Sequence, residues 1–343
     1  MSSDMTSDMS SRMTRVFVTH PTDKLDQYFG PNATRALQAI ADVRFNTEAH
    51  ELSTPALIVA AQGCDALIAY RQTPGPEALF RELPQLAAFI RCAVDIRTVD
   101  VAAASAQGVL VTQASPGYAA AVAEWVVGAM VDLGRGTSRY AAAYHRGQAP
   151  APFMGRQLRG STLGIIGYGE IGQTLGELAL ALGMRLLVDT PQPVAARAGL
   201  QQVPLQALLA DSDFVVCLAP ANAQTENLMN AAAFAAMKPD ACFINASRGE
   251  LVDEAALLHA LDGGRLAGCA IDVGRAPDQM PSPVLARHPL VVAAPHIGGL
   301  TLPAIEHQAL ETVAQLAALQ RGEMPPGAVN AAHAKRLQSW SKP

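Results

Sequence analysis

Two polar residues that each follow a short apolar run could together carry out chemistry on a small oxo acid. Arg248 lies in the segment NASRG (residues 245–249), and His296 lies in PHIGG (residues 295–299). A guanidinium offers a planar fork of donors that holds a carboxylate or polarises a carbonyl. An imidazole titrates near neutrality and can move a proton at the carbonyl oxygen. Taken alone, an arginine at a strand end is more often part of a surface ion pair; taken together, the two residues suit hydride transfer at a carbonyl carbon.

A glycine-rich turn predicts a dinucleotide beside these residues. The segment GYGEIG (residues 167–172) follows an apolar run and opens a helical stretch. Gly167 permits the tight turn, Gly169 lets a pyrophosphate approach the backbone, and Gly172 lets the helix press on the strand. The start of the helix offers free N–H groups and its positive dipole end to the phosphates. We expect Glu170 and Ile171 to line this site, with the Glu170 carboxylate pointing away from the phosphates.

An acidic residue ends the next strand and predicts which dinucleotide is bound. Asp189 comes 22 residues after Gly167 and follows the apolar run 185–188. A carboxylate at this place accepts hydrogen bonds from the ribose hydroxyls and repels the 2′-phosphate of NADP. The pattern therefore favours NAD; the alternative is a glycine-rich turn followed by an ordinary exposed aspartate.

Parallel sheets are needed to bring these residues together. Short apolar runs alternate with helical stretches almost throughout, which indicates an α/β protein with two doubly wound parallel sheets. In the first third, strands are expected at 16–18, 56–60, 66–69, 87–90 and 109–112; from Thr162 on, six more are expected at 163–166, 185–188, 214–219, 242–245, 269–271 and 291–294. Six strands match a complete dinucleotide-binding sheet, so Arg248, Asp272 and His296 would follow three neighbouring strand ends.

The chain is expected to form two domains from three segments. We predict a mobile tail at 1–14, the first part of a substrate domain at 15–117, and a Rossmann NAD-binding domain at 118–300. Residues 134–160, rich in turn formers, are expected to cross between the domains. Residues 301–343, with a helix at 302–320, would return and complete the smaller substrate domain.

Composition excludes several other classes of protein. Hydrophobic residues make up 50% of the 343 residues and charged residues 16%, so the chain is not intrinsically disordered. The net charge of −5 offers no field that attracts nucleic acid or an anionic membrane. The five cysteines form no close pair, which predicts reduced thiols, a cytoplasmic location and no metal site.

The motifs, in this order, resemble the D-isomer-specific 2-hydroxyacid dehydrogenase family. The resemblance runs from about residue 86 to residue 330 and includes LRGSTLG (158–164), the glycine turn, NASRG, LVDEAAL (251–257), PHIGG and PPGAVN (325–330). It implies a flavodoxin-like substrate domain, an NAD-binding domain, a homodimer, and interconversion of a 2-oxo acid and a D-2-hydroxy acid.

The resemblance also implies a role for individual residues. Arg248 takes the position of the family's substrate-binding arginine, His296 that of its acid/base histidine, and Asp272 that of the aspartate beside the nicotinamide. Further cofactor contacts are expected at Pro220, Thr225, Ala246 and Gly299. Substrate contacts are expected at Arg71, Val94 and Asp95.

Two departures from the family keep alternatives open. The family has a glutamate that hydrogen-bonds the histidine, whereas this chain has Pro277 at that position; Asp278 takes the role if the loop carries one extra residue. Otherwise another group supports His296, or the activity is weakened or lost. Asp95 replaces a glycine of the substrate loop and puts the usual substrate in doubt. The alternatives are therefore a nucleotide-sensing regulatory protein of the same fold, or a dehydrogenase of an unusual acid such as phosphite or formate.

Overall fold

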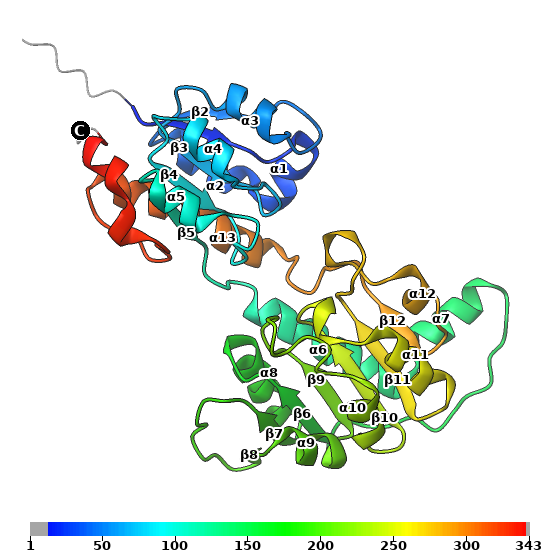
Figure 1. Ribbon diagram of the computed structural model, residues 1–343. Helices are drawn as coiled ribbons and strands as arrows, with labels where there is room; N and C mark the ends of the chain where they lie inside the picture. The colour runs from blue at the N-terminus through cyan, green and yellow to red at the C-terminus, as the bar shows by residue number, and fades with distance from the viewer. Residues whose placement is uncertain (1–12, 341–343) are drawn as a thin grey trace, which may run out of the picture. The chain divides into compact units, whose positions relative to one another are not determined.

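Strands and helices alternate along residues 13–340, which are the residues that the structure, a computed structural model, describes (Figure 1). The chain divides into two units, each considered by itself. Unit 1 contains the described residues up to Gly117 together with those from Leu302 on, and unit 2 spans Tyr118–Thr301. Residues 134–160, which we expected to cross between the domains, lie wholly within unit 2. Most of the tail predicted at 1–14 lies outside the described residues.

Unit 1 is built on a five-stranded parallel sheet of order β2-β1-β3-β4-β5. This is the flavodoxin-like order, in which the direction of winding reverses between β1 and β3. Its strands are β1 (Arg15–Val18), β2 (Asp42–Phe45), β3 (Ala66–Ala69), β4 (Ala88–Arg91) and β5 (Leu110–Gln113). Its helices are α1 (Thr22–Tyr28), α2 (Gly30–Gln38), α3 (Thr54–Ala60), α4 (Glu77–Glu82), α5 (Val101–Ala106), α13 (Leu302–Gln320), and the short 3-10 turns η3 (Ala331–His333) and η4 (Lys335–Ser339).

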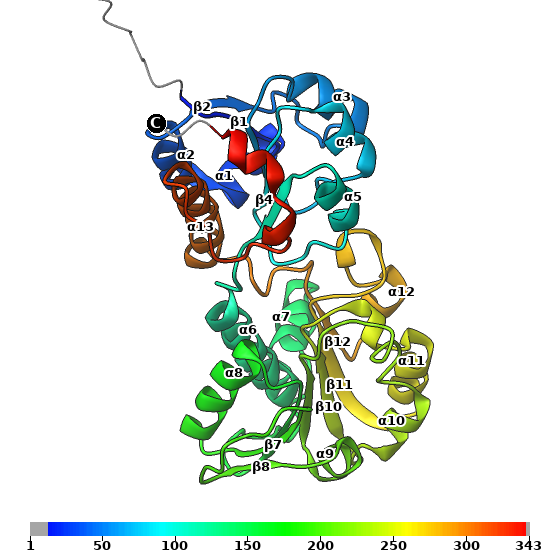
Figure 2. The same cartoon turned by 60° about the vertical axis from the view of Figure 1, so that its left-hand side comes forward.

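Helices cover both faces of this sheet (Figure 2). One core joins the sheet to α2 and α13, with Leu37, Val313 and Leu316 among its members. The core on the other face joins the sheet to α3, α4 and α5. The predicted helix at 302–320 is present with the same bounds, and its apolar side completes one of the two cores.

Two expectations for unit 1 are wrong in detail. The apolar run 56–60, which we expected to be a strand, forms the last five of the seven residues of helix α3. Ser53 precedes this helix and Pro55 lies in its first turn, where proline's fixed φ favours a helix start. Strand β2 was not predicted, because its residues alternate between exposed and half-buried positions and form no apolar run.

Unit 2 is built on a seven-stranded parallel sheet of order β12-β11-β10-β9-β6-β7-β8. Its strands are β6 (Thr162–Ile166), β7 (Arg185–Asp189), β8 (Leu200–Gln202), β9 (Phe214–Cys217), β10 (Ala241–Asn245), β11 (Leu266–Ile271) and β12 (Val291–Ala293). Its helices are α6 (Ala119–Arg135), α7 (Thr137–His145), α8 (Glu170–Ala181), α9 (Leu205–Asp211), α10 (Ala231–Ala236), η1 (Gly249–Leu251), α11 (Glu254–Asp262), η2 (Pro277–Gln279) and α12 (Pro283–Ala286).

The order of these strands is that of a Rossmann sheet with one added strand at an edge. Helices α6 and α8 cover one face, and α9, α10 and α11 cover the other. The winding reverses between β6 and β9, and ligands of open α/β sheets bind beyond the strand ends at such a point. The six predicted strands are present; β8 was missed because it is a short, largely exposed edge strand.

In the part of the chain that the structure describes, the cysteines and charged groups do not meet the requirements of a metal site. All five cysteines are free and buried, and burial raises the pKa of each thiol. Within residues 13–340, no cluster of histidine, cysteine or acidic side chains could hold a metal ion. In the same residues, no helix combines the length and the apolar composition needed to cross a membrane.

A fully buried histidine lies at the reversal point of the unit 1 sheet. His20 follows β1, is 1% exposed, and packs its ring against the rings of Phe29 and Tyr70 at centroid distances of 5.2 and 5.1 Å. Neither ring nitrogen has a well-formed hydrogen bond. Burial lowers the pKa of His20 to about 3, and the nearby backbone of Tyr28 opposes this only in part. The fold therefore holds this imidazole neutral.

This histidine makes the stability of unit 1 depend on pH. The unfolded chain binds a proton at His20 below about pH 6.5, whereas the folded chain binds it only near pH 3. The free energy of unfolding therefore decreases as the pH falls from about 6.5 to about 3. At pH 5 the loss is about 2 kcal/mol. We expect His20→Leu to remove that part of the difference in the free energy of unfolding between pH 8 and pH 5, measured by urea denaturation. The exposed His50→Gln is the control; an equal pH dependence in His20→Leu and the wild type would contradict the assignment.

Candidate active site

The turn between β6 and α8 is shaped by glycines whose side-chain positions are filled by other atoms. Gly167 has a left-handed backbone with φ of +90°, and a Cβ there would lie 2.6 Å from the Ala219 nitrogen. A Cβ on Gly172 would lie 2.7 Å from the Gly167 oxygen. The Gly167 amide donates to the carbonyl of Asp189 over 2.8 Å, which ties the turn to the end of β7. These contacts require glycine at both positions.

Gly169, the middle glycine of the turn, opens onto free space. A Cβ on Gly169 would meet no atom within 4 Å. Helix α8 begins directly after it, and no side chain caps the N–H groups of the first turn. Open space beside uncapped donors at a helix start fits a pyrophosphate. Glu170, in that first turn, is exposed, and Ile171 is half-buried.

Asp189 lies at the end of β7, next to the glycine turn. The residue is half-buried, and this partial burial raises the pKa of its carboxyl above the ordinary value. Hydroxyl donors from a ribose would favour the charged form and oppose the shift. The residues present therefore fit the adenosine end of a dinucleotide.

The turn that carries Arg248 follows β10 and is formed by Asn245. The Asn245 side chain is buried; its oxygen accepts from the Ser247 amide over 3.1 Å, and its nitrogen donates to the Arg248 carbonyl over 3.0 Å. The Ser247 hydroxyl donates to the carbonyl of Ala219, in the segment after β9. Arg248 itself donates to the Ser247 carbonyl over 2.8 Å. Two neighbouring strand ends are thus joined around the arginine.

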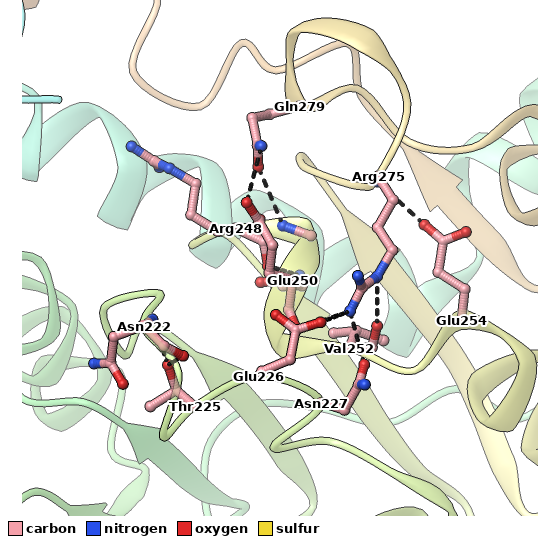
Figure 3. Close-up of polar contacts among 12 residues, drawn as sticks. Asn222, Thr225, Glu226, Asn227, Arg248, Glu250, Val252, Glu254, Arg275 and Gln279 are labelled. Carbon is pink, nitrogen blue, oxygen red and sulfur yellow. Dashed lines mark hydrogen bonds and ion pairs between the residues drawn. The ribbon is translucent and has the colours of Figure 1, made fainter. Parts of the chain in front are cut away.

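The loop that follows β11 packs on this turn. A Cβ on Gly249 would lie 2.2 Å from the carbonyl carbon of Gly274, so the two backbones are in direct contact. The Gln279 side chain reaches the same turn, where its oxygen accepts from the Gly249 amide over 3.4 Å and its nitrogen donates to Glu250 over 3.3 Å (Figure 3). Arg275 in this loop contacts the turn as well, and the Arg248 side chain extends away from Arg275. Sequence reasoning missed Arg275 and Gln279, because their partners are distant in the chain.

Asp272 fixes the backbone that carries His296. The carboxylate follows β11, is 3% exposed, and accepts from the Ile297 and Gly298 amides, each over 2.7 Å. The His296 amide donates to the Asp272 carbonyl over 3.0 Å. His296 has a left-handed backbone with φ of +57°, a strained conformation for a residue with a side chain. Burial raises the pKa of Asp272, although its two amide donors and His296 oppose the shift.

The remaining predicted cofactor contacts lie in loops at the same edge. The Thr225 hydroxyl donates to the Pro220 carbonyl over 2.7 Å and accepts from the Asn222 amide over 2.9 Å, which closes the loop after β9 (Figure 3). Ala246 follows β10, and Gly299 follows the histidine segment, where a Cβ would lie 3.1 Å from Tyr118.

Asp278, our candidate partner of His296, lies in the 3-10 turn η2 (Pro277–Gln279). Its side chain is outside the described part of the structure. Pro277 occupies the first position of the turn, where proline is well tolerated.

The three predicted substrate contacts belong to unit 1 and follow neighbouring strands. Arg71 comes after β3, with its guanidinium 5.3 Å from the centre of the Tyr28 ring. Val94 and Asp95 lie in the loop after β4, the next strand of the sheet. Arg97 donates to both Asp95 oxygens, with Nη2 2.8 Å from Oδ2 and Nε 3.1 Å from Oδ1. The negative charge of Asp95, the residue that departs from the family's glycine, is therefore paired within the loop.

A fully buried arginine forms a hydrogen bond to the same loop. Arg91, the last residue of β4, donates to the carbonyl of Tyr70 and to the Thr98 hydroxyl. Burial lowers its pKa to about 10, while Asp95 acts in the opposite direction. Arg91 thereby links the segments after β3 and β4.

The fold and the site together define an NAD-binding α/β protein. Comparisons with known proteins agree with this class. The profile of the D-isomer specific 2-hydroxyacid dehydrogenase, NAD binding domain, matches residues 127–298. The glyoxylate reductase of Thermococcus onnurineus is 31% identical over 315 residues, covering 87% of this chain and 92% of that protein. The chain therefore belongs to the D-isomer-specific 2-hydroxyacid dehydrogenase family, and NAD is its cofactor.

Other relatives extend the similarity over most of the chain. D-3-phosphoglycerate dehydrogenase 3, chloroplastic, of Arabidopsis thaliana is 31% identical over 316 residues, covering 91% of this chain and 53% of that protein. The chain thus spans about half the length of the phosphoglycerate dehydrogenases that it matches. The apo structure of D-lactate dehydrogenase from Escherichia coli has a TM-score of 0.81 and 25% identity, covering 92% of this chain and 100% of that one.

Proposed function

We propose that the protein interconverts a 2-oxo acid and the D-2-hydroxy acid, with NAD as the hydride carrier. The observation that carries the proposal is the edge of the unit 2 sheet, where Arg248 and His296 follow β10 and β12 on either side of β11 and its buried Asp272. The relatives are named for acids of this kind: glyoxylate, lactate and phosphoglycerate.

Each of these residues has a defined role in the proposed reaction. Arg248 binds the carboxylate and the carbonyl oxygen through its fork of N–H donors. His296 gives a proton to that oxygen as the carbonyl carbon gains a hydride, and takes the proton back in the reverse direction. The nicotinamide, when bound, supplies or accepts the hydride. Asp272 holds the amides of Ile297 and Gly298 and so keeps the histidine segment in place.

Substitution of the two proposed catalytic residues tests this assignment. Arg248→Ala and His296→Ala are each expected to lower kcat/KM by about 100-fold or more, because carboxylate binding or proton transfer is lost. NADH affinity, measured by fluorescence titration, should stay near the wild-type value. The assay covers glyoxylate, pyruvate, hydroxypyruvate and phenylpyruvate with NADH, and phosphite and formate with NAD.

The panel also separates the competing functions. Turnover of a 2-oxo acid by the wild type supports the proposal, and turnover of phosphite or formate alone would move it to another substrate. NADH binding without any turnover would instead favour a nucleotide-sensing protein, a function suggested by Pro277 in place of the family's glutamate. Near-normal rates in either alanine variant would refute the roles given to Arg248 and His296.

We further propose that Asp278 supports His296 as its acidic partner. The loop that bears it is packed against the Arg248 turn through Gly274 and Gln279, so residue 278 is held at the same edge of the sheet. A carboxylate beside the imidazole favours its protonated form. Asp278→Asn is therefore expected to move the alkaline limit of the reduction rate to lower pH, measured as kcat/KM against pH. An unchanged profile would show that another group supports the histidine.

We also propose that the protein is a homodimer that pairs through α7 and the following segment. Tyr144, Phe153 and Met154 are 65%, 46% and 97% exposed, and they lie together in unit 2. Large apolar groups that gather on a surface are typical of an interface. Sedimentation velocity should show a dimer that Met154→Glu weakens, whereas Met324→Glu, at a 48% exposed position in unit 1, should not. A monomeric wild type at micromolar concentration would refute the dimer.

A further inference from the structure

One arginine joins three segments of the unit 2 edge that lie far apart in the sequence. The Nη2 atom of Arg275 donates to Glu226 Oε1 over 2.9 Å and to Asn227 Oδ1 over 2.7 Å, both in the segment after β9. The same atom donates to the Glu250 carbonyl over 2.9 Å, and Nε donates to the Val252 carbonyl over 3.3 Å. The guanidinium therefore lies between the loop after β9 and the turn after β10 (Figure 3).

These two segments also pair with each other through their backbones. The Asn227 amide donates to the Glu250 carbonyl over 2.8 Å, and the Met229 amide donates to the Leu251 carbonyl over 2.9 Å. Met229 and Val252 form a parallel bridge. The loop closed by Thr225 is thus hydrogen-bonded, through Asn227, to the turn that carries Arg248.

The loop that bears Arg275 is itself closed and docked. The Gly274 amide donates to the Gln279 carbonyl over 2.8 Å, and Gln279 has a left-handed backbone with φ of +60°. The Gln279 side chain contacts the turn at Gly249 and Glu250, on the far side of the loop from Arg275. The loop is therefore fixed to the Arg248 turn through Arg275 and Gln279, and Arg275 extends this link to the segment after β9.

The hydrogen bonds of Arg275 to backbone carbonyls, rather than its ion pair with Glu226, hold the neighbouring segments together. The side chains of Arg275 and Glu226 are 37% and 45% exposed, and an ion pair with this exposure is screened by water and contributes little. A planar guanidinium can donate to several acceptors at once, whereas an ammonium is a single point charge. Loss of the arginine leaves the Glu250 and Val252 carbonyls without a common donor.

We propose that Arg275 is a positioning residue that couples the cofactor loop, residues 220–228, to the Arg248 turn, so that an occupied cofactor loop orients Arg248 toward the substrate. This inference rests on the function proposed above and adds a residue to it. Arg275 touches neither substrate nor cofactor; it acts through the backbone of residues 250–252.

The test compares four variants of the full chain. Arg275→Met removes the side-chain hydrogen bonds and leaves the backbone amide that donates to Glu254. Arg275→Lys keeps the charge without the planar fork, and Glu226→Gln keeps an acceptor while removing the ion pair. Arg321→Met is the control, because Arg321 is an exposed arginine in unit 1 that pairs with Glu323 and lies outside the network of Arg275. All variants are first compared with the wild type by thermal denaturation and NADH titration.

The first readout is hydrogen exchange, which does not depend on turnover. In the wild type, NADH is expected to slow exchange both in residues 220–230 and in residues 249–253. In Arg275→Met, NADH should still protect 220–230, but protection of 249–253 should fall by about tenfold. Equal protection of both segments in the variant and the wild type would overturn the proposal.

The second readout is the division of the kinetic effect between substrate and cofactor. Arg275→Met should raise KM for the best 2-oxo acid and lower kcat/KM by about tenfold, with a smaller change in NADH affinity. Arg275→Lys should recover part of this loss, and Glu226→Gln should change kcat/KM by no more than about threefold. A variant that only lost thermal stability, with unchanged kinetics, would show that Arg275 is merely structural.

The two readouts separate failure of this inference from failure of the proposed function. Absence of wild-type turnover, with the exchange effect present, would refute the dehydrogenase while the coupling stands. Normal turnover with no effect of Arg275→Met on exchange or kinetics would refute the coupling while the dehydrogenase stands.

Discussion

The arrangement of the unit 2 edge depends on one buried carboxylate. Asp272 ends the central strand of the three that carry the candidate catalytic groups, and both of its oxygens accept from amides of the segment after β12. A buried carboxylate is costly unless donors surround it, so Asp272 strongly favours one path for the Ile297 and Gly298 backbone. His296, whose left-handed backbone would not form by itself, is held between these contacts and β12.

Both departures from the family pattern are compensated close by in the chain. Asp95, which replaces a glycine, is paired with Arg97 two residues later and also interacts electrostatically with the buried Arg91. The loop that contains Pro277 gains two contacts with the Arg248 turn, through Arg275 and Gln279. Each compensation keeps a loop ordered without the residue that the family uses.

The sequence predicted the α/β class, the family and most strands, because apolar runs and glycine spacing are local signals. It failed where the signal was weak or ambiguous. The run 56–60 is as apolar as a buried strand, but it follows Pro55 in the first turn of a helix. Strands β2 and β8 are edge strands that lack the buried apolar run by which a strand is predicted. The network around Arg275 depends on residues up to 49 positions away, and no periodicity or motif reports such a distance. The roles of Arg248, His296 and Asp278 remain predictions, since their assignment came from strand ends and from resemblance.

The placement of α13 has a consequence for how the protein forms during translation. Ala309, Val313 and Leu316 cover one face of the unit 1 sheet, although its strands end at Gln113. Unit 2 is contiguous and can bury its own cores before α13 is synthesised. The part of this face that α13 covers, beside α2, therefore stays open on the ribosome while nearly two hundred residues are added. Throughout that interval the nascent chain presents an apolar surface of the kind that chaperones recognise.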